Sequence, residues 1–279
     1  MSIEIVKADG TKETFNRAKL ESSLIRTGAD RQTTKDIADH IESELKDGMA
    51  TTEIYNHAFD LLSKSFRPAA HKYSLRRAIL ELGPAGYSFE KYVADLFRAR
   101  GYEAVTDQVV RGKCVEHEVD VVAWKGNELV MVEAKFHNES GTKSDLKVAL
   151  YVKARTDDLS LSEFDFGGKI RKLTQGMLVT NTKFTQKAIE YAACEGLRLV
   201  GWNYPAQGNL EHMIEDAGLH PVTSIPSLSD VNRKILIDAG LVLCKDVLAK
   251  KDALVGLGIP EDSIKTITAD AELICGAAA

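Results

Sequence analysis

The feature that most constrains the fold is a pair of apolar segments within residues 118–135, separated by the dipeptide Gly126-Asn127. A two-residue loop with glycine at its first central position is typical of a tight β-hairpin turn. With the turn placed there, Val121 faces Val132 across the hairpin, and the neighbouring apolar residues pair in the same register. Because side chains alternate between the two faces of a strand, this register predicts a hairpin with one apolar, buried face.

The same register is expected to bring four charged residues together on the other face, with Asp120 opposite Glu133 and Glu118 opposite Lys135. Opposed side chains on antiparallel strands have Cβ atoms about 4.5 to 5.5 Å apart, so two carboxylates there repel each other unless a cation lies between them. Mg²⁺ is commonly held by one or two carboxylates with water and substrate phosphate. We therefore predict an Mg²⁺ or Mn²⁺ site at Asp120 and Glu133. The alternative is a pair of edge carboxylates neutralised by Lys135.

Predicted helices and strands alternate around this hairpin. An amphipathic helix precedes it, and a helix, a strand, a helix and a strand follow, at residues 89–100, 146–156, 176–180, 185–195 and 197–202. Such alternation is typical of an α/β domain, here with a mixed sheet. We assign residues 86–206 to this domain.

Asp120, followed after a short hairpin by Glu133-Ala134-Lys135, resembles the catalytic core of the PD-(D/E)xK nucleases and, within them, of the Mrr-like restriction endonucleases. Close Mrr relatives often carry Gln where Glu133 stands, so this chain has the more general acidic form. The family's first helix often adds an acidic residue, and the matching position is Glu90. The resemblance implies metal-dependent hydrolysis of DNA phosphodiester bonds. Asp120 and Glu133 would hold the metal, Glu90 would join them, and Lys135 would stabilise the charge that develops on the phosphate.

Two basic clusters follow the hairpin in sequence: Lys143, Lys147, Lys153 and Arg155 in one, and Lys169, Arg171 and Lys172 in the other. The net charge of the chain is −5, but contact with DNA phosphates needs only a local basic surface. We predict that Lys143 and Lys147 contact DNA, the alternative being that both clusters are ordinary solvated faces. His117 and His137 flank the predicted site, where we expect structural or supporting roles.

Residues 1–84 are assigned to a mostly helical domain, in which strands at Ile3–Lys7 and Lys12–Phe15 precede amphipathic helices. This segment resembles an ATP-cone, the nucleotide-sensing module best known from ribonucleotide reductases. The matching residues are Val6-Lys7-Ala8-Asp9-Gly10, Glu13, Phe15-Asn16, Lys19-Leu20 and Thr51-Thr52-Glu53-Ile54-Tyr55.

The resemblance implies that ATP or dATP is bound by six residues, namely Lys7, Glu13, Asn16, Lys19, Thr51 and Tyr55. The two lysines supply positive charge for the phosphates, whereas Glu13 and Asn16 can hydrogen-bond the base or the ribose. Ala8 stands where the family has a second basic residue. A degenerate cone used only for packing or dimerisation is therefore the alternative.

Residues 218–279 are expected to form a small all-α domain of short helices broken by glycine and proline. This segment resembles a tandem helix-hairpin-helix module, in which backbone N–H groups of a hairpin and a helix N-terminus bind a DNA phosphate. Gly256 and Gly258 are the predicted DNA-binding positions, whereas the first hairpin, at residues 225–229, has serine where glycine is usual. Protein interaction and plain packing are the alternatives.

These segments predict a multidomain α/β protein, with an ATP-cone, a restriction-endonuclease-like domain and a helix-hairpin-helix-like domain. No apolar run is long enough to span a bilayer and no secretory signal is recognised, so a cytoplasmic protein without a membrane partner is expected. The four cysteines lie far apart and form no CxxC pair, which favours free thiols: Cys114, Cys194, Cys244 and Cys275.

Two functions are compatible with this organisation. The first is a metal-dependent DNA endonuclease regulated by ATP or dATP, and the second is a nucleotide-sensing DNA-binding regulator with an inactive nuclease fold. The intact set of Asp120, Glu133 and Lys135 favours the enzyme. RNA as the substrate is a weaker third hypothesis. Cutting both DNA strands usually requires two active sites, so we also expect a homo-oligomer, a dimer or higher.

Overall fold

The computed structural model describes residues 3–7, 10–65, 67–82, 89–139 and 141–276 of the chain. They divide into two compact units. The first comprises Met1–Glu81, Glu139–Gly141 and His220–Ala279, and the second comprises Leu82–Asn138 and Thr142–Leu219. Among the described residues, no helix combines the length and apolar character needed to cross a membrane.

The second unit is an α/β domain. Its helices and strands are α5 (Phe89–Ala99), β4 (Glu103–Arg111), β5 (Glu116–Lys125), β6 (Glu128–Lys135), β7 (Lys143–Ser144), α6 (Leu146–Ser160), β8 (Glu163–Phe166), β9 (Lys169–Lys172), β10 (Gln175–Thr180), β11 (Lys183–Phe184), α7 (Gln186–Glu195), β12 (Arg198–Val200) and α8 (Leu210–Ala217).

Five of these strands form one mixed sheet in the order β12-β10-β6-β5-β4. β6 is antiparallel to β5 but parallel to β10, and β10 is parallel to β12. Because β6 and β10 run in the same direction, their carboxyl ends meet at one edge of the sheet, where Lys135 is paired with Thr180. The predicted mixed sheet is therefore confirmed, and the Glu133-Ala134-Lys135 segment lies at this edge.

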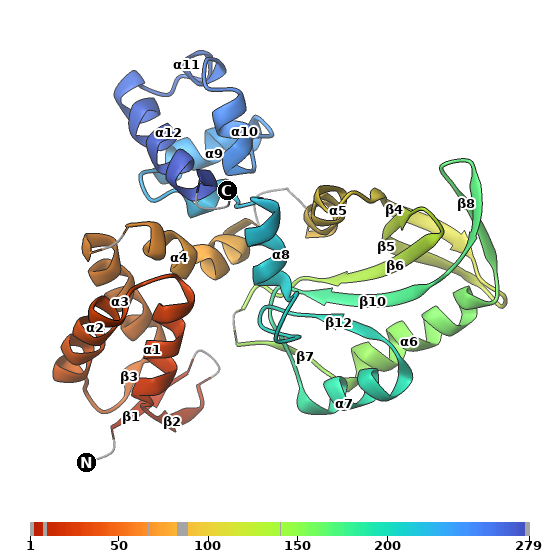
Figure 1. Cartoon of the computed structure of the whole chain (residues 1–279), viewed down its shortest axis with the longest axis horizontal. Coiled ribbons are helices and arrows are strands. Elements are labelled where there is room, and N and C mark those ends of the chain that lie inside the picture. Colours follow the sequence, from red (N-terminus) through yellow and green to blue (C-terminus); the bar gives the residue numbers. More distant parts are fainter. Residues whose placement is uncertain (1–2, 8–9, 66, 83–88, 140, 277–279) are drawn as a thin grey trace. The chain divides into compact units, whose positions relative to one another are not determined.

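Helices cover both faces of the sheet (Figure 1). α5 packs on β4, β5 and β6, whereas α6 packs on β10 and α7. The approach of α6 is close, because a Cβ added to Gly176 in β10 would lie 2.2 Å from Thr156 Oγ1. α5 turns one apolar face inward, with six buried residues: Phe89, Tyr92, Val93, Ala94, Leu96 and Phe97. This face fixes the orientation of the helix that carries Glu90.

The hairpin register predicted from Gly126-Asn127 is confirmed over five residue pairs, from Lys125 with Glu128 to Val121 with Val132. The ladder between β5 and β6 ends there, so the prediction that Asp120 pairs directly with Glu133 is wrong in detail. The cause is a side chain: Asp120 Oδ2 accepts a hydrogen bond of 2.7 Å from the backbone N–H of Ala134. The carboxylate takes the place that a backbone carbonyl would have in a continued ladder.

The partner strand β4 is irregular at the same level. Asp107 lies between the pairs Thr106 with Val121 and Gln108 with Val119, and its φ is +56°. Non-glycine residues rarely adopt this left-handed conformation. The register is the same on both sides of Asp107, so the pairing is interrupted without an inserted residue. The sheet is therefore distorted across two strands at the position of Asp120.

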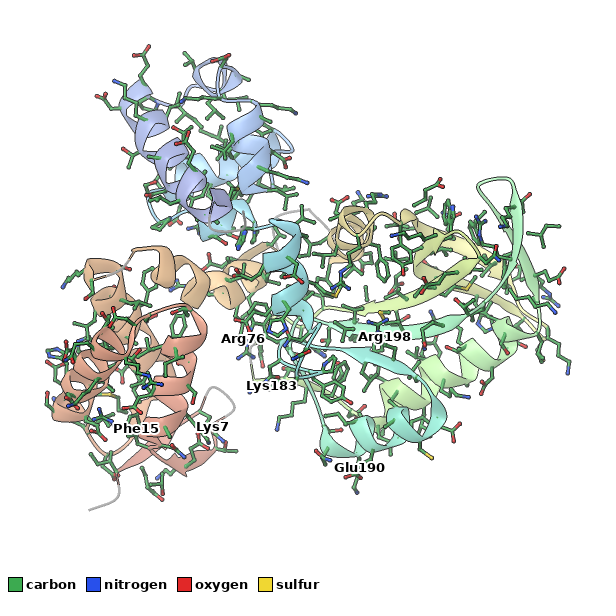
Figure 2. The ribbon with its side chains drawn as sticks, viewed as in Figure 1. Lys7, Phe15, Arg76, Lys183, Glu190 and Arg198 are labelled. Carbon is green, nitrogen blue, oxygen red and sulfur yellow. The ribbon has the colours of Figure 1, made fainter. Side chains whose placement is uncertain are left out.

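The first unit begins with β1 (Glu4–Val6), β2 (Lys12–Thr14), α1 (Arg17–Arg26), α2 (Arg31–Glu44), β3 (Met49–Ala50), α3 (Thr51–Ser65) and α4 (Arg67–Leu82). The strands form a small sheet in the order β2-β1-β3. Helices α1, α2 and α3 pack around a core that includes Leu24, Ile41, Ala58 and Leu62. Lys7 directly follows β1, and β2 leads through Phe15 into α1 (both residues are labelled in Figure 2).

The first unit continues with a 3₁₀ turn (Val222–Ser224), α9 (Asp230–Asp238), α10 (Cys244–Ala249), α11 (Ala253–Gly256) and α12 (Glu261–Gly276). These surround a second apolar core that includes Leu236, Val247, Leu254 and Ile267. The small all-α character predicted for this segment is confirmed. The last of these helices, α12, is longer than the short helices predicted, because its buried residues follow a single helical face over its whole length.

The sequence did not reveal the β8–β9 hairpin, helix α8, or the short strands β3, β7 and β11. The β8–β9 hairpin is short, and it carries the basic residues that were interpreted as a cluster. Helix α8 lies in the segment left between the second and third predicted domains. The strands β3, β7 and β11 have two residues each and carry no periodicity that a sequence reveals.

Candidate active site and nucleotide pocket

Asp120 lies at the centre of the candidate active site. Its pKa is raised from 3.8 to about 6. Burial is the largest cause, the hydrogen bond from the Ala134 N–H opposes the rise, the nearby carboxylates of Glu133 and Glu90 add to it, and the Arg155 guanidinium also opposes it. Three acidic side chains from β5, β6 and α5 therefore interact electrostatically at one place. This is the grouping expected from the sequence, although the direct cross-strand pair is absent.

Glu90 reaches the site because the first turn of α5 adjoins the carboxyl end of β6. The rings of Phe89 and Phe136 are 5.6 Å apart and join these two elements. Glu90 itself is half-buried. Its position in the first helical turn favours a negative charge, since the N-terminus of a helix is electropositive.

Arg155 is the site residue whose position the sequence analysis got wrong. It was grouped with a basic surface cluster, but in the structure its side chain is 9% exposed and pairs with Glu133 Oε2 at 2.8 Å. Its guanidinium also donates to the backbone oxygen of Glu118 at 2.9 Å and lies over the ring of Tyr151. The sequence signal for its burial is its spacing within α6, since it stands three residues after Val152 and four before Leu159, which are both buried.

Lys135 ends β6 and is exposed at the sheet edge. The chain beyond it is held by Asn181, a buried residue that follows β10. Asn181 Oδ1 accepts from the His137 N–H at 2.8 Å, and Asn181 Nδ2 donates to the His137 carbonyl at 2.9 Å. The His137 ring contacts Ser144 Oγ at 3.0 Å. Asn181 therefore fixes the backbone immediately after Lys135, a role not expected from the sequence.

His137 and His117 differ in their surroundings. Burial and the charge of Lys135 lower the pKa of His137, which keeps its imidazole neutral at neutral pH. His117 lies farther along β5 and contacts Asp158 Oδ2 at 2.8 Å. Asp158 also accepts from the backbone N–H groups of Cys114 and Val115, so this group ties the β4–β5 connection to α6. The structural role expected for His117 agrees with these contacts.

The donor set of the candidate site suits a hard divalent cation. Carboxylate oxygens are the ligands that Mg²⁺ takes, usually one or two of them with water. Among the described residues, the oxygens of Asp120, Glu133 and Glu90 do not all approach within 4.8 Å of one another. Since Arg155 holds one oxygen of Glu133, the arrangement fits an ion bound by two carboxylates better than one enclosed by three.

In the first unit, five of the six predicted nucleotide-binding residues line one cavity of about 230 Å³. They are Glu13, Asn16, Lys19, Thr51 and Tyr55, joined by Ile5, Phe15, Leu20, Ser23 and Ile54. The sixth, Lys7, reaches the same place, because its Nζ lies 2.8 Å from Glu13 Oε2. The resemblance to the ATP-cone thus selects residues that the fold brings together.

The charges in this cavity are already paired. Lys19 Nζ lies 3.0 Å from the same Glu13 oxygen that Lys7 contacts, and hydrogen bonds from both lysines lower the pKa of Glu13. Asn16 caps α1, since its Oδ1 accepts from the Lys19 N–H at 3.2 Å. Its amide nitrogen is the part of the side chain that can turn to a ligand.

A second cavity of about 440 Å³ adjoins the first and shares Thr51 and Tyr55 with it. Its other lining residues are Thr52, Asn56, Arg76, Arg77 and Leu80. Arg76 is labelled in Figure 2, and it comes from α4 together with Arg77. Neither arginine was among the six residues assigned to the nucleotide site from the sequence. Their charge makes this cavity suited to phosphate groups.

The predicted DNA-binding residues occupy separate places. Lys143 in β7 and Lys147 in α6 are exposed, close in sequence to the carboxyl edge of the sheet. In the C-terminal segment, Gly256 ends α11, and Gly258 has a φ of +80° in the turn before α12. The residues of the second basic cluster do not all lie on the surface, because Arg171 is buried and donates hydrogen bonds to the carbonyls of Gly126 and Lys169.

The mixed sheet, the Asp120 site and the cavity at β1, β2 and α1 define a restriction-endonuclease-like protein with an ATP-cone. Family models agree: a restriction endonuclease model (Mrr type) matches residues 84–203, and an ATP cone domain model matches residues 3–81. A third model, AF1548-like, C-terminal, matches residues 220–275. The helix-hairpin-helix interpretation of that segment stays a prediction.

Two similar proteins extend this result. An uncharacterized protein of Archaeoglobus fulgidus is 37% identical over 185 residues, which are 66% of this chain and 100% of the relative. The crystal structure of AF1548, described as a protein of unknown function, has 37% sequence identity and a TM-score of 0.51. The match covers 67% of this chain and 96% of that one. The chain therefore belongs to the AF1548-like family of proteins with an Mrr-type restriction-endonuclease domain.

Proposed function

We propose that this protein is an Mg²⁺- or Mn²⁺-dependent DNA endonuclease that is regulated by ATP or dATP bound in its N-terminal cone. The observation that carries the proposal is the state of Asp120, a half-buried carboxylate beside Glu133 and Glu90 whose pKa is raised to about 6. Carboxylates that repel one another at the edge of a sheet are unfavourable for folding alone. A divalent ion bound by the carboxylates would compensate that repulsion, so metal binding explains why they are grouped here.

Asp120 and Glu133 are the residues that would hold the ion. When bound, it would polarise the scissile phosphate and acidify an attacking water. The Ala134 N–H orients one oxygen of Asp120, and Arg155 orients Glu133. Each carboxylate then keeps an oxygen for the ion. Glu90 adds negative charge that strengthens cation binding from the side of α5.

Lys135 projects from the same side of β6 as Glu133, two residues away. Its exposed ammonium is available to bind non-bridging phosphate oxygens and to stabilise their charge in the transition state. Asn181 keeps the following backbone in place, so the lysine is presented from a fixed strand end. Lys143 and Lys147 extend the positive surface for flanking phosphates.

Nucleotide binding in the cone would require two lysines to exchange a carboxylate partner for phosphate groups. Lys7 and Lys19 now share Glu13, and phosphate groups would compete with this carboxylate for both lysines. Thr51 and Tyr55 border both cavities. The phosphates would then lie where the two cavities meet at Thr51 and Tyr55, within reach of the lysines on one side and of Arg76 and Arg77 on the other.

The test is incubation of supercoiled plasmid with the full chain and Mg²⁺ or Mn²⁺, with and without ATP or dATP. Cleavage is expected from the wild type and loss of at least about 10²-fold in Glu133→Ala, the size of effect seen when a key electrostatic group is removed. Glu116→Ala, an exposed carboxylate at the start of β5, is the matched control. Unchanged cleavage by Glu133→Ala would refute the site, and labelled RNA tested alongside DNA decides the substrate.

One observation favours the second function, a nucleotide-sensing DNA-binding regulator. Glu133 Oε2 forms an ion pair with Arg155 Nη1 at 2.8 Å. Such an ion pair would neutralise the charge of Glu133 in a site that binds no metal. The same preparation distinguishes the two functions. DNA and nucleotide binding without cleavage under any metal condition would support the regulator and reject the enzyme.

A further inference from the structure

A second cluster of donor groups lies in the N-terminal cone, away from the nuclease carboxylates. Among the described residues, it is the one set of three His, Cys, Asp or Glu side chains whose donor atoms all lie within 4.8 Å of one another: His40, Glu44 and His57. His40 and Glu44 are four residues apart on α2, so they share a helix face. His57 comes from the facing helix α3.

The distances within this cluster are unusual for hydrogen bonds. His40 Nε2 lies 3.4 Å from Glu44 Oε1, and His57 Nδ1 lies 3.3 Å from Glu44 Oε2. Charge-assisted hydrogen bonds are about 2.7 to 2.9 Å long. Zn²⁺ bonds to histidine and carboxylate are about 2.0 to 2.2 Å, so two ligand atoms of a tetrahedral site are separated by about 3.3 to 3.5 Å. Each histidine nitrogen therefore lies at such an edge length from the Glu44 oxygen nearest to it, Oε1 for His40 and Oε2 for His57, and one donor atom from each of the three residues lies within 4.8 Å of the others.

The three side chains are accessible to an ion from solution, and their orientation suits its binding. The three side chains are 46%, 53% and 33% exposed, in the order His40, Glu44 and His57. The two imidazole rings meet edge to face at 5.1 Å, and each presents a ring nitrogen to the Glu44 carboxylate. Two histidines and one carboxylate, with one position open to water, are an established ligand combination for zinc.

The neighbouring acidic residues of α2 have a different partner from Glu44, which contacts the two histidines. The other acidic residues of the last turns of α2, Asp39 and Glu42, are bound by Arg17 of α1 at 2.6 Å and 2.5 Å. They therefore face α1, whereas Glu44 faces α3. Helix α2 thus has one acidic face that is paired with Arg17 and another that presents His40 and Glu44 to His57 of α3.

We propose that His40, Glu44 and His57 bind a zinc-class transition-metal ion that links α2 to α3. Imidazole donors select such metals over Mg²⁺, which prefers oxygen ligands. The link has a consequence for the cone, because α3 also carries Thr51 and Tyr55 of the nucleotide cavity. Fixing α3 against α2 holds the wall of that cavity, so metal binding stabilises the cone and tightens nucleotide binding.

The experiment is calorimetric titration of the full chain with Zn²⁺, carried out in the Asp120→Asn, Glu133→Gln background to weaken binding at the nuclease site. One equivalent of tight binding is expected. His57→Ala and His40→Ala should weaken it by at least about 100-fold, more than is typical for loss of a residue that only supports a ligand. Glu42→Gln is the matched control on the same helix, and it should leave Zn²⁺ affinity unchanged.

Co²⁺ provides an independent measurement, since tetrahedral coordination gives strong visible absorption, whereas Co²⁺ in an octahedral, Mg²⁺-type site absorbs only weakly. That absorption is expected in the wild type and in Glu42→Gln, and it should disappear in His57→Ala. Circular dichroism of the metal-free variants establishes that they fold. Absence of Zn²⁺ binding to the wild type, or equal binding by the wild type and both histidine variants, would overturn the proposal.

Discussion

Arg155 Nη1 lies 2.8 Å from Glu133 Oε2, and the side chains of both residues are largely buried. A cation from α6 is thus placed against the acidic residue of β6 that the sequence assigns to the metal. The pair joins helix to sheet beneath the candidate active site, and it lowers the local negative charge that Asp120 experiences. Its consequences for stability and pH dependence are measurable.

Replacing Arg155 by Met is expected to destabilise the protein by about 3 to 5 kcal/mol, because a buried carboxylate loses its partner. The double variant Arg155→Met, Glu133→Gln removes both charges and should regain most of that loss. Chemical denaturation of the four proteins of this cycle gives the coupling energy. A single Arg155→Met variant as stable as the wild type would contradict the importance of the ion pair.

In the same variant, the pH dependence of cleavage should move to higher pH. Arg155 lowers the pKa of Asp120, so its loss raises that pKa above about 6. More alkaline solution is then needed to ionise Asp120 and bind the metal. The measurement is the rate of plasmid cleavage between pH 5 and pH 9 at saturating Mg²⁺, which requires the proposed nuclease activity.

Asp120→Asn is expected to abolish cleavage and yet stabilise the metal-free protein at pH 8. The pKa of Asp120 is raised from 3.8 to about 6 in the folded state, so folding loses stability as the pH rises through this interval and the carboxylate ionises. The gain is on the order of 1 kcal/mol after allowance for partial solvent screening. It should vanish near pH 4, where the wild-type residue is protonated.

Mg²⁺ provides the control for that prediction. It should raise the unfolding temperature of the wild type at pH 8 by binding the ionised carboxylate, and it should have little effect on Asp120→Asn. Differential scanning fluorimetry at both pH values tests this. A stabilisation that is equal at pH 4 and pH 8 would point to a cause other than ionisation of Asp120.

Lys19→Ala should weaken ATP or dATP binding to the full chain by about 10-fold or more, the value of one charge-assisted phosphate contact. Lys12→Ala, a change at an exposed lysine of β2 outside the cavity lining, is the control. Fluorescence titration with a labelled adenine nucleotide measures both. Equal affinities for the two variants would remove Lys19 from the nucleotide site.

The predicted DNA surface is tested by salt dependence. The Lys143→Ala, Lys147→Ala double variant should reduce the slope of log K against log salt by about 2, since each lost phosphate contact contributes about 0.9. The control is Lys169→Ala, Lys172→Ala, because these lysines already contact Asn127 and Glu163. If only the control variant changed the slope, the DNA-contacting surface would instead be the β8–β9 hairpin.

The sequence predicted the central hairpin well because its evidence is local. Gly126-Asn127 fixes a two-residue turn, and apolar alternation fixes the register up to Val121 with Val132. It failed at the next pair, where the Asp120 side chain binds the Ala134 N–H. Alternation describes backbone pairing, and it carries no information about a side chain that replaces a backbone acceptor.

The sequence by itself therefore determined the strand register, the mixed α/β character, and which acidic and basic residues to consider. Only the tertiary structure decided their partners. Arg155 belongs in sequence to the same basic cluster as exposed Lys147, yet packing of α6 buries it against Glu133. His40 and His57 lie on different helices, and only the packing of α2 on α3 brings both to Glu44. Periodicity arises within one element, whereas these contacts arise between elements and depend on how the apolar faces fit together.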